Sequence, residues 1–345
     1  MRSDFGVGRR DFLKVSGASA AALGAAAGLG TEAAAAPPPA LEGVPGDTKY
    51  PKLAIRTRYS PQRLAFAASA GYEGVVIAID HNFDPDTLTD SAIDQALATA
   101  QQTGARIISL EAMDNLNHLE VDPVKRKAIR ARFIRCMELG HRLGCKFVGT
   151  LSGGMANTSL DDQIKAYAEV INQEYMPVCE KLDLHIGHEN WPAFQNHAST
   201  PASWAKLFAL VPNPRYGLEF DPSHLVRQYI NPIAAAWDYK DRIYAVHAKD
   251  TEIIEPVLQQ VGIHGSGWWN YRIPGQGLVN WSEFINVLLH AKFNGGIAIE
   301  HEDPFWDEPN GDAGAELLPA RKDGFILAAR YLRQYLPARL GPPAV

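Results

Sequence analysis

The sequence has few cysteines and no excess of basic residues. Its three cysteines include no CxxC pair and leave an odd count, so a framework of disulfides is not expected. Lysine and arginine number 33 against 39 acidic residues, which gives a net charge of −6 at pH 7. Proteins that follow a phosphate backbone normally carry a basic surface, so we expect no nucleic-acid partner.

Long hydrophobic runs are also missing. A helix that spans a bilayer needs about 20 mostly apolar residues. The longest candidate, residues 15–30, is shorter than that and rich in alanine and glycine, so we expect no stable membrane anchor. The hydrophobic content of 46% is nevertheless that of a globular domain with a sizeable core.

The N-terminal segment resembles a twin-arginine export signal. Arg9 and Arg10 precede the weakly apolar stretch, Gly8 stands where Ser or Thr is usual, and small residues lead up to Ala36. The resemblance implies a signal peptide over residues 1–36, a Pro-rich linker over 37–51, and a periplasmic or secreted protein carried by the twin-arginine translocase. Because such cargo folds before export, its metal can be loaded inside the cell, where a weakly bound ion is not displaced by copper or zinc.

Short runs rich in β-branched residues alternate with longer segments of helical period along the rest of the chain. We predict strands over residues 53–58, 74–80, 106–111, 147–150, 184–189, 216–221, 243–247 and 296–300. The helices predicted to follow them are 61–70, 87–103, 123–143, 160–181, 201–210, 232–239, 281–290 and 317–336. Eight β-then-α units predict an α/β fold, a single-domain (β/α)8 TIM barrel over residues 52–340.

An open doubly wound sheet is the alternative fold, and it usually carries a glycine-rich phosphate turn after its first strand. Here residues 57–61 read Thr-Arg-Tyr-Ser-Pro, without glycine, which favours the barrel. The longest stretch predicted to be irregular, residues 251–280, follows the seventh strand. Loops of that length in compact domains tend to serve function.

Acids and histidines stand at the carboxyl ends of four successive predicted strands, the ends that build the active site of a barrel. Each of these residues has a structural explanation by itself, such as a helix cap or a salt bridge. Together they indicate a shared ion, because ionisable groups are costly in an apolar interior unless paired or metal-bound. A site of carboxylates and one imidazole suits Mn²⁺ or Mg²⁺, with Co²⁺ and Zn²⁺ also compatible.

These residues resemble the sugar phosphate isomerase/epimerase family of the xylose-isomerase-like barrel superfamily, over about residues 50–340. The similarity is carried by Glu-Asn-Trp-Pro at 189–192, Asp-Pro-Ser-His-Leu-Val at 221–226 and Arg-Ile-Pro-Gly-Gln-Gly at 272–277. It implies one divalent metal bound by four ligands, Glu189, Asp221, His247 and Glu300. Glu302 lies two residues beyond Glu300 on the same face, so either glutamate could be the fourth ligand.

The resemblance also implies a reaction. Glu189 and Glu300 would remove and return a proton next to a carbonyl, giving an enediolate that the metal stabilises, while His224 would hold a substrate oxygen and Arg272 the far end. Aromatic faces stack on sugar rings, so we expect Trp268 and Trp269 to contact substrate as well. Lys249 shares a face with His247 and could enter the site.

We therefore expect an isomerase or epimerase of an unphosphorylated sugar or keto-sugar, since sugar phosphates are cytoplasmic and no basic cluster is predicted at the strand ends. Three alternatives stay open: β-elimination from a 3-keto-glycoside, a metal-dependent endonuclease on a similar barrel, and a sugar-binding protein without catalysis. Charge and the export signal count against the endonuclease. His188 is expected to face the barrel wall, and a homo-oligomer is left open.

Overall fold

The computed structural model describes residues 51–113, 116–193 and 196–336. The predicted signal peptide and nearly all of the predicted linker lie outside the described residues, as do the last residues of the predicted barrel, 337–340. Among the described residues, no helix combines the length and the apolar character needed to cross a membrane.

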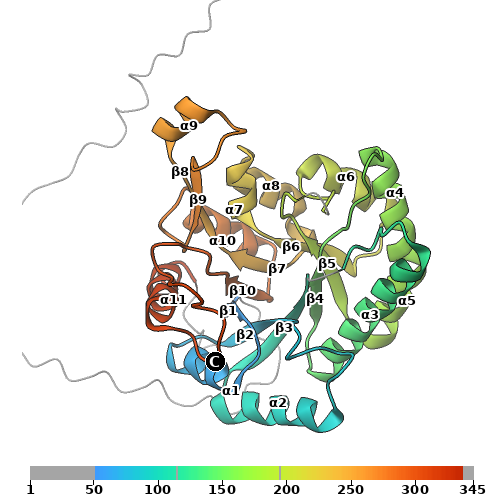
Figure 1. The fold of residues 1–345 in the computed structure, drawn as a ribbon, viewed down its shortest axis with the longest axis horizontal. Helices are drawn as coiled ribbons and strands as arrows, with labels where there is room; N and C mark the ends of the chain where they lie inside the picture. The colour runs from blue at the N-terminus through green and yellow to red at the C-terminus, as the bar shows by residue number, and fades with distance from the viewer. Residues whose placement is uncertain (1–50, 114–115, 194–195, 337–345) are drawn as a thin grey trace, which may run out of the picture. The chain divides into compact units, whose positions relative to one another are not determined.

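Eight parallel strands close into a barrel, in the order β1-β10-β7-β6-β5-β4-β3-β2 (Figure 1). The predicted (β/α)8 TIM barrel is thereby confirmed. The strands are β1 (Lys52–Thr57), β2 (Gly74–Ala78), β3 (Arg106–Ala112), β4 (Phe147–Thr150), β5 (His185–Glu189), β6 (Tyr216–Phe220), β7 (Ile243–Ala248) and β10 (Gly296–Ile299). They are buried along almost their whole length, as expected for strands covered by helices on the outside and packed side chains within.

Helices surround this barrel and return the chain to the start of each next strand. They are α1 (Pro61–Ser69), α2 (Asp90–Thr103), α3 (Pro123–Arg142), α4 (Leu160–Val170), α5 (Met176–Leu182), α6 (Pro201–Leu210), α8 (Pro232–Tyr239), α10 (Trp281–His290) and α11 (Pro319–Leu332). Several begin with a polar cap followed by proline, as at Thr200 and Asn231. This order satisfies a free backbone N–H at the helix start and fixes the first helical turn.

Two parts of the chain differ from the predicted helices. The single helix predicted over 160–181 is interrupted by a π-helical turn, η1 (Ile171–Tyr175), between α4 and α5. A short helix, α7 (Pro222–Arg227), is absent from the sequence prediction, because its six residues are too few to show a helical period. A 3₁₀ turn, η2 (Lys240–Arg242), leads into β7.

The prediction that residues 251–280 are irregular is wrong, because this segment belongs to an antiparallel hairpin. Strand β8 (Asp250–Ile253) pairs with β9 (Trp269–Arg272), and helix α9 (Glu255–Val261) lies between them. Figure 1 shows this hairpin standing out beyond the ring of helices. The buried carboxylate of Asp250 fixes its base by accepting hydrogen bonds from the backbone of Gly275 and Val279 and from the indole of Trp281.

Candidate active site and metal centre

Four of the predicted site residues meet at the carboxyl end of the barrel. Glu189 ends β5, Asp221 follows β6 and caps α7, His247 lies in β7, and Glu300 follows β10. One ligand atom from each lies within 4.8 Å of those of the other three, and all four residues are buried. The strand order therefore gathers residues that are far apart in the sequence.

These four residues fit a divalent cation. His247 Nδ1 lies 3.0 Å from Glu189 Oε1 and 3.2 Å from Glu300 Oε2, so the imidazole and two carboxylates already converge. Asp221 Oδ1 accepts the backbone N–H of Ser223, whereas its other oxygen, Oδ2, is buried without a hydrogen-bond partner among the described residues. Its charged neighbour is the Lys249 ammonium group at 3.2 Å, and a divalent cation bound there would stabilise the same buried oxygen. Three oxygen donors and one nitrogen donor suit Mn²⁺, Mg²⁺, Co²⁺ or Zn²⁺ without choosing among them.

The electrostatics keep the carboxylates of Glu189 and Glu300 ionised. Burial opposes ionisation of Glu189, but the charge of His247 and hydrogen bonds from His224 and His247 hold its pKa below the usual range. Burial likewise opposes ionisation of Glu300, yet Lys249 and His247 lower its pKa well below the usual range. Burial favours the neutral form of His247, but the surrounding glutamates, Glu300 foremost, raise its pKa well above its ordinary value. The cluster thus attracts positive charge.

His224 is oriented by a residue from the hairpin. Its Nε2 lies 3.1 Å from Glu189 Oε1, and its Nδ1 lies 2.7 Å from the hydroxyl of Tyr271 on β9. An ionised carboxylate can only accept, so Nε2 carries a hydrogen, and in the neutral ring Nδ1 accepts from the Tyr271 hydroxyl. Tyr271 is not among the predicted site residues. Its signal in the sequence is its place in the aromatic run with Trp268 and Trp269, ahead of Arg272.

Lys249 lies inside the cluster rather than at its edge. Its ammonium group donates to Glu300 at 2.6 Å and to Glu302 at 2.9 Å, and it lies 3.2 Å from Asp221 Oδ2. The ring of Tyr271 covers it at 4.5 Å. Only 2% of the Lys249 side chain is exposed, against 47% of Glu302. Glu302 therefore pairs with Lys249 near the surface, while Glu300 belongs to the four-residue cluster.

Three ionisable residues that sequence reasoning did not single out as site residues lie next to the cluster. Glu111 at the end of β3 and Glu219 in β6 approach His247 Nε2 at 2.7 and 3.3 Å. Arg56 in β1 pairs with Glu111 at 2.5 Å and lies 3.8 Å from Glu300. The signal that could have found them is a charged residue inside an otherwise apolar strand, because such a residue is costly without a partner.

The residues predicted to hold the far end of a substrate have structural partners. Arg272 donates to Asp303 and to Glu252, each at 2.9 Å. Trp268 is buried, and its indole N–H donates to the carbonyl of Gly265. Trp269 carries the guanidinium of Arg227 over its ring at 4.0 Å. These contacts hold the hairpin together and link it to α7 and to the segment after β10. Direct contact of these side chains with a substrate stays a prediction.

His188 lies where the sequence placed it, against the barrel wall. Its Nδ1 lies 2.7 Å from the hydroxyl of Tyr216, and the two rings stack. The residue is fully buried, and burial lowers its pKa to about 3, so it is neutral.

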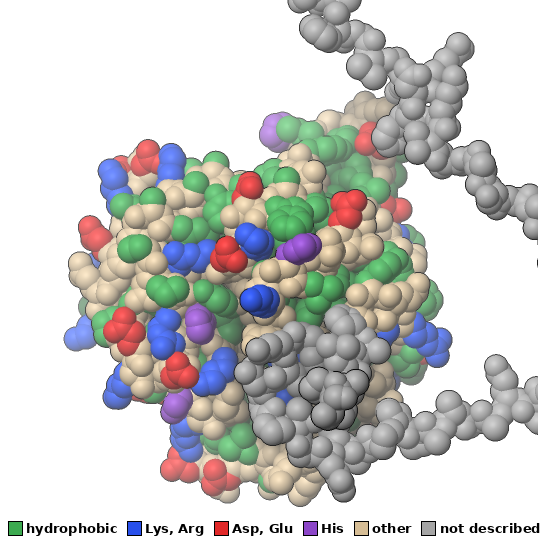
Figure 2. All heavy atoms as spheres, turned by 180° about the vertical axis from the view of Figure 1, so that it is seen from behind, with side chains coloured by type: hydrophobic (Ala, Val, Ile, Leu, Met, Phe, Trp, Pro, Cys, Tyr) green, Lys and Arg blue, Asp and Glu red, His purple; other side chains and the backbone are tan. Residues whose placement is uncertain are grey.

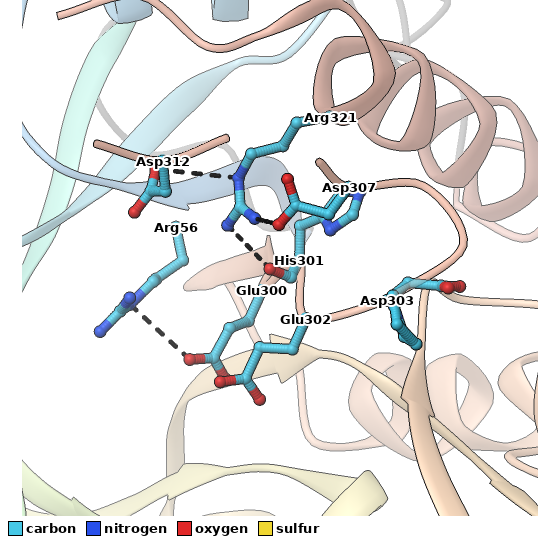
Figure 3. Close-up of a pocket in the computed structure, with 9 residues that line it drawn as sticks. Arg56, Glu300, His301, Glu302, Asp303, Asp307, Asp312 and Arg321 are labelled. Atoms are coloured by element: carbon cyan, nitrogen blue, oxygen red, sulfur yellow. Dashed lines mark hydrogen bonds and ion pairs between the residues drawn. The ribbon is translucent and has the colours of Figure 1, made fainter. Parts of the chain in front are cut away.

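A cavity of about 270 Å³ adjoins the cluster. Glu300 and Glu302 line it together with Arg56, and Arg321 lies above them between Asp307 and Asp312 (Figure 3). Sites for drug-sized ligands typically have volumes of about 300–1,000 Å³. This cavity is slightly smaller, so it suits one small molecule. The lining is almost entirely polar, so that molecule should carry many hydroxyl or carbonyl groups.

Comparisons with known proteins give the same fold. The profile of the xylose isomerase-like TIM barrel family matches residues 64–322. The Bacillus subtilis (strain 168) protein YfiH is 34% identical over 100 residues, 26% of this chain and 32% of YfiH. Inosose dehydratase of Clostridium beijerinckii is 31% identical over 104 residues, 29% of this chain and 35% of that enzyme. Each match therefore spans about a third of the curated relative's length.

A solved structure is similar over a longer part of the chain. The apo crystal structure of 3-keto-D-glucoside 4-epimerase from E. coli has a TM-score of 0.61. The similarity covers 82% of this chain and 99% of that one, at 15% sequence identity. At that identity the comparison establishes a shared fold.

Proposed function

Because the chain belongs to the xylose isomerase-like TIM barrel family, we propose that it is a divalent-metal-dependent isomerase or epimerase of an unphosphorylated sugar or keto-sugar. One observation carries the proposal: Glu189 and Glu300, from strands separated by two others, converge on one buried cluster beside a polar cavity. Of two carboxyl groups around one substrate carbon, the ionised one can remove a proton, and the other can deliver one once it has taken up a proton from solvent. We expect the ion to be manganese, because the ligand set resembles that of the sugar phosphate isomerase/epimerase family.

A bound dication would supply stabilisation of negative charge on a substrate oxygen. The chain's own residues would carry the protons. Glu189 holds its Oε1 between His224 and His247, so its carboxylate is fixed in place, and Glu300 is fixed by Lys249. His224 would share its Nε2–H between Glu189 Oε1 and a substrate oxygen. Proton return to the neighbouring carbon gives isomerisation, and return to the other face gives epimerisation.

The surroundings of the cavity support an uncharged substrate. Its lining includes two arginines, but Arg321 is paired with Asp307, and Arg56 with Glu111. The remaining acidic residues would repel a phosphate group. Hydroxyl groups, by contrast, both donate and accept hydrogen bonds and match such a surface. The further side chains that we propose to contact the substrate are Arg272, Trp268, Trp269 and Lys249.

The experiment that tests this proposal works even though the sugar is unidentified. The Mn²⁺-loaded protein is incubated in D₂O with a panel of ketoses and keto-glycosides, and deuterium uptake at carbon is followed by NMR. We expect uptake at the carbon next to the carbonyl in at least one substrate, with or without net conversion. Sugar binding without any deuterium uptake across the panel would instead support a binding protein without catalysis.

A second reaction on the same scaffold is β-elimination from a 3-keto-glycoside. Two observations favour it: the match to an inosose dehydratase, and Lys249, whose ammonium group could protonate a leaving oxygen. Both reactions begin by removing the same kind of proton. Product analysis separates them, because elimination releases the aglycone and isomerisation does not.

We also propose export through the twin-arginine translocase. The proposal rests on Arg9, Arg10 and the weakly apolar segment that follows them. Replacing both arginines by lysine should keep the protein in the cytoplasm, as measured by fractionation and immunoblotting. The same substitutions should leave metal binding of the purified protein unchanged, and unaffected export would disprove the assignment.

The endonuclease alternative has little support. On the face drawn in Figure 2, the described acidic and basic side chains are interspersed rather than gathered into a basic stripe. The net charge of −6 points the same way, since binding to a nucleic-acid backbone is dominated by phosphate contacts.

A further inference from the structure

Two buried carboxylates lie on the side of His247 that faces away from the metal cluster. Its Nδ1 faces Glu189 and Glu300, whereas its Nε2 lies 2.7 Å from Glu111 Oε1 and 3.3 Å from Glu219 Oε1. Both of these deeper glutamates are 1% exposed. The imidazole is thus held between two pairs of carboxylates, one pair at each ring nitrogen.

The deeper pair has almost no other partners. Neither oxygen of Glu219 has a hydrogen-bond partner among the described residues, and neither has Glu111 Oε1. Glu111 Oε2 is paired with Arg56. A buried carboxylate without hydrogen bonds destabilises the folded protein by roughly several kcal/mol unless a nearby charge compensates it. The nearest group that compensates Glu219 is the imidazole of His247.

The barrel is built to admit this costly side chain. Gly149 in β4 has no Cβ, and a Cβ placed there would overlap the carboxylate of Glu219, whose atoms are its three nearest neighbours. An apolar residue at position 219 would fill the same space without the cost of burying a carboxyl group. The position therefore makes physical sense if the carboxylate acts on His247.

We infer that Glu111 and Glu219 are positioning residues of the metal centre, which hold the His247 ring with Nδ1 toward the ion and Nε2–H toward the barrel interior. The inference rests on the proposed metal centre. A histidine ligand whose second nitrogen faces a carboxylate is fixed in one tautomer and becomes a stronger donor. Glu111 also pairs with the guanidinium of Arg56 at 2.5 Å, which fixes its carboxylate beside Nε2.

A second metal ion between Glu111, Glu219 and His247 is the competing interpretation, since these three residues also lie within metal-ligand distances of one another. It would require both ring nitrogens of His247 to bind ions, and therefore an imidazole that has lost both protons. A neutral imidazole offers only one lone pair, so we favour a single ion at Nδ1.

The test compares metal affinity in Glu219→Gln, Glu111→Gln and wild type, with Glu138→Gln on the exposed face of α3 as the matched control. We expect the dissociation constant for Mn²⁺, measured by titration with EPR detection of free ion, to rise about 10- to 100-fold in both core variants and not in the control. The visible absorption of bound Co²⁺ should also change, because it reports the ligand field at the ion. A role in packing alone would lower stability but leave both readouts unchanged.

Gly149→Ala is the second kind of variant, because it displaces the Glu219 carboxylate without removing its charge. It should weaken Mn²⁺ binding in the same direction, and wild-type affinity in all three variants would overturn the inference. Two ions per wild-type chain by elemental analysis would also overturn it, in favour of a second metal site. No ion in wild type would instead refute the proposed metal centre itself.

Discussion

Gly149 on β4 leaves the space that the carboxylate of Glu219 on β6 occupies inside the barrel. The two residues lie on strands separated by β5, and their fit depends on the absence of a side chain at position 149. Glycine is needed here for close approach rather than for an unusual backbone angle. The pair shows that a charged residue in the interior has been accommodated by its neighbours.

This relationship predicts a non-additive pair of substitutions. Gly149→Ala alone should destabilise the metal-free protein by about 1–3 kcal/mol, because an added methyl group overpacks against Glu219. In the double variant with Glu219→Ala, the methyl group meets no carboxylate, so the cost of Gly149→Ala should fall. A double-mutant cycle of urea unfolding would measure the coupling, about 0.5–3 kcal/mol for residues in contact. Strictly additive effects would contradict the fit.

Metal binding should stabilise the folded protein. An ion that binds only the folded state, present at about 100 times its dissociation constant, adds about 2.7 kcal/mol. We therefore expect Mn²⁺ to raise the midpoint of thermal unfolding of wild type and a chelator to reverse the rise. Asp221→Ala removes one carboxylate of the four-residue cluster and should abolish the response. An equal response in that variant would argue for ion binding elsewhere.

Glu302→Gln tests which glutamate after β10 is the ligand. Glu300 belongs to the four-residue cluster, while Glu302 is half exposed and pairs with Lys249. We expect the Glu302→Gln protein to retain one ion per chain by elemental analysis, and Glu300→Ala to lose affinity for it. A metal-free Glu302→Gln protein would move the ligand assignment to Glu302.

The barrel could be predicted from the sequence because its strands are short, almost fully buried and separated by helices of regular period. The same reasoning failed after β7. There the hairpin strands β8 and β9 are only partly buried, and residues such as Asp250 and Tyr271 are held by tertiary contacts rather than by local alternation. A pattern of period two arises only where one face of a strand is buried throughout.

The site was predicted unevenly for a related reason. Residues at strand ends, such as Glu189 and His247, are recognisable because the barrel fold places strand ends together. Glu111 and Glu219 lie inside strands and face His247 from the side opposite the metal cluster. Which acid inside a strand faces a given histidine depends on the strand order and the register. Lys249 was expected to enter the site, but its bonds to acidic partners follow only from the folded arrangement.

Stability should fall in mild acid because of a buried neutral histidine. His118 is fully buried, with its ring nitrogens near the hydroxyls of Tyr175 and Thr150, and burial lowers its pKa to about 3. The unfolded chain binds a proton near pH 6.5 and the folded chain does not. The contribution of His118 to the free energy of unfolding is therefore fully present above pH 6.5 and is lost as the pH falls toward 3. Between pH 7 and pH 5 the loss is about 2 kcal/mol.

His118→Gln isolates this contribution, because glutamine keeps hydrogen-bonding groups but does not titrate. From pH 7 to pH 5, the free energy of unfolding should fall by about 2 kcal/mol less in the variant than in wild type. Urea denaturation of the metal-free proteins would measure it. The exposed His264 provides a control, and His264→Gln should follow the wild-type dependence. Parallel curves for His118→Gln and wild type would show that His118 takes up a proton in the folded state as readily as in the unfolded chain.

The division of proton transfer between Glu189 and Glu300 can be tested before the natural substrate is identified. Their carboxylates reach the cluster from β5 and β10, with β6 and β7 between them, which suits removal of a proton on one side of a substrate and delivery on the other. Changing either to Gln keeps its size and one ligand oxygen but removes its ability to carry a proton. Turnover should fall about 10²- to 10⁴-fold while Mn²⁺ is retained.

The informative measurement is isotopic, because the two variants should differ from each other. In D₂O, the variant that keeps the base should still exchange the substrate proton, and the variant that lacks it should not. Glu302→Gln is the matched control, since it removes a nearby carboxylate outside the four-residue cluster and should leave exchange intact. If both Glu189→Gln and Glu300→Gln retain near-normal turnover with metal bound, the two glutamates are ligands only. The proton carrier must then be sought at His224 or Lys249, which contact Glu189 and Glu300 respectively.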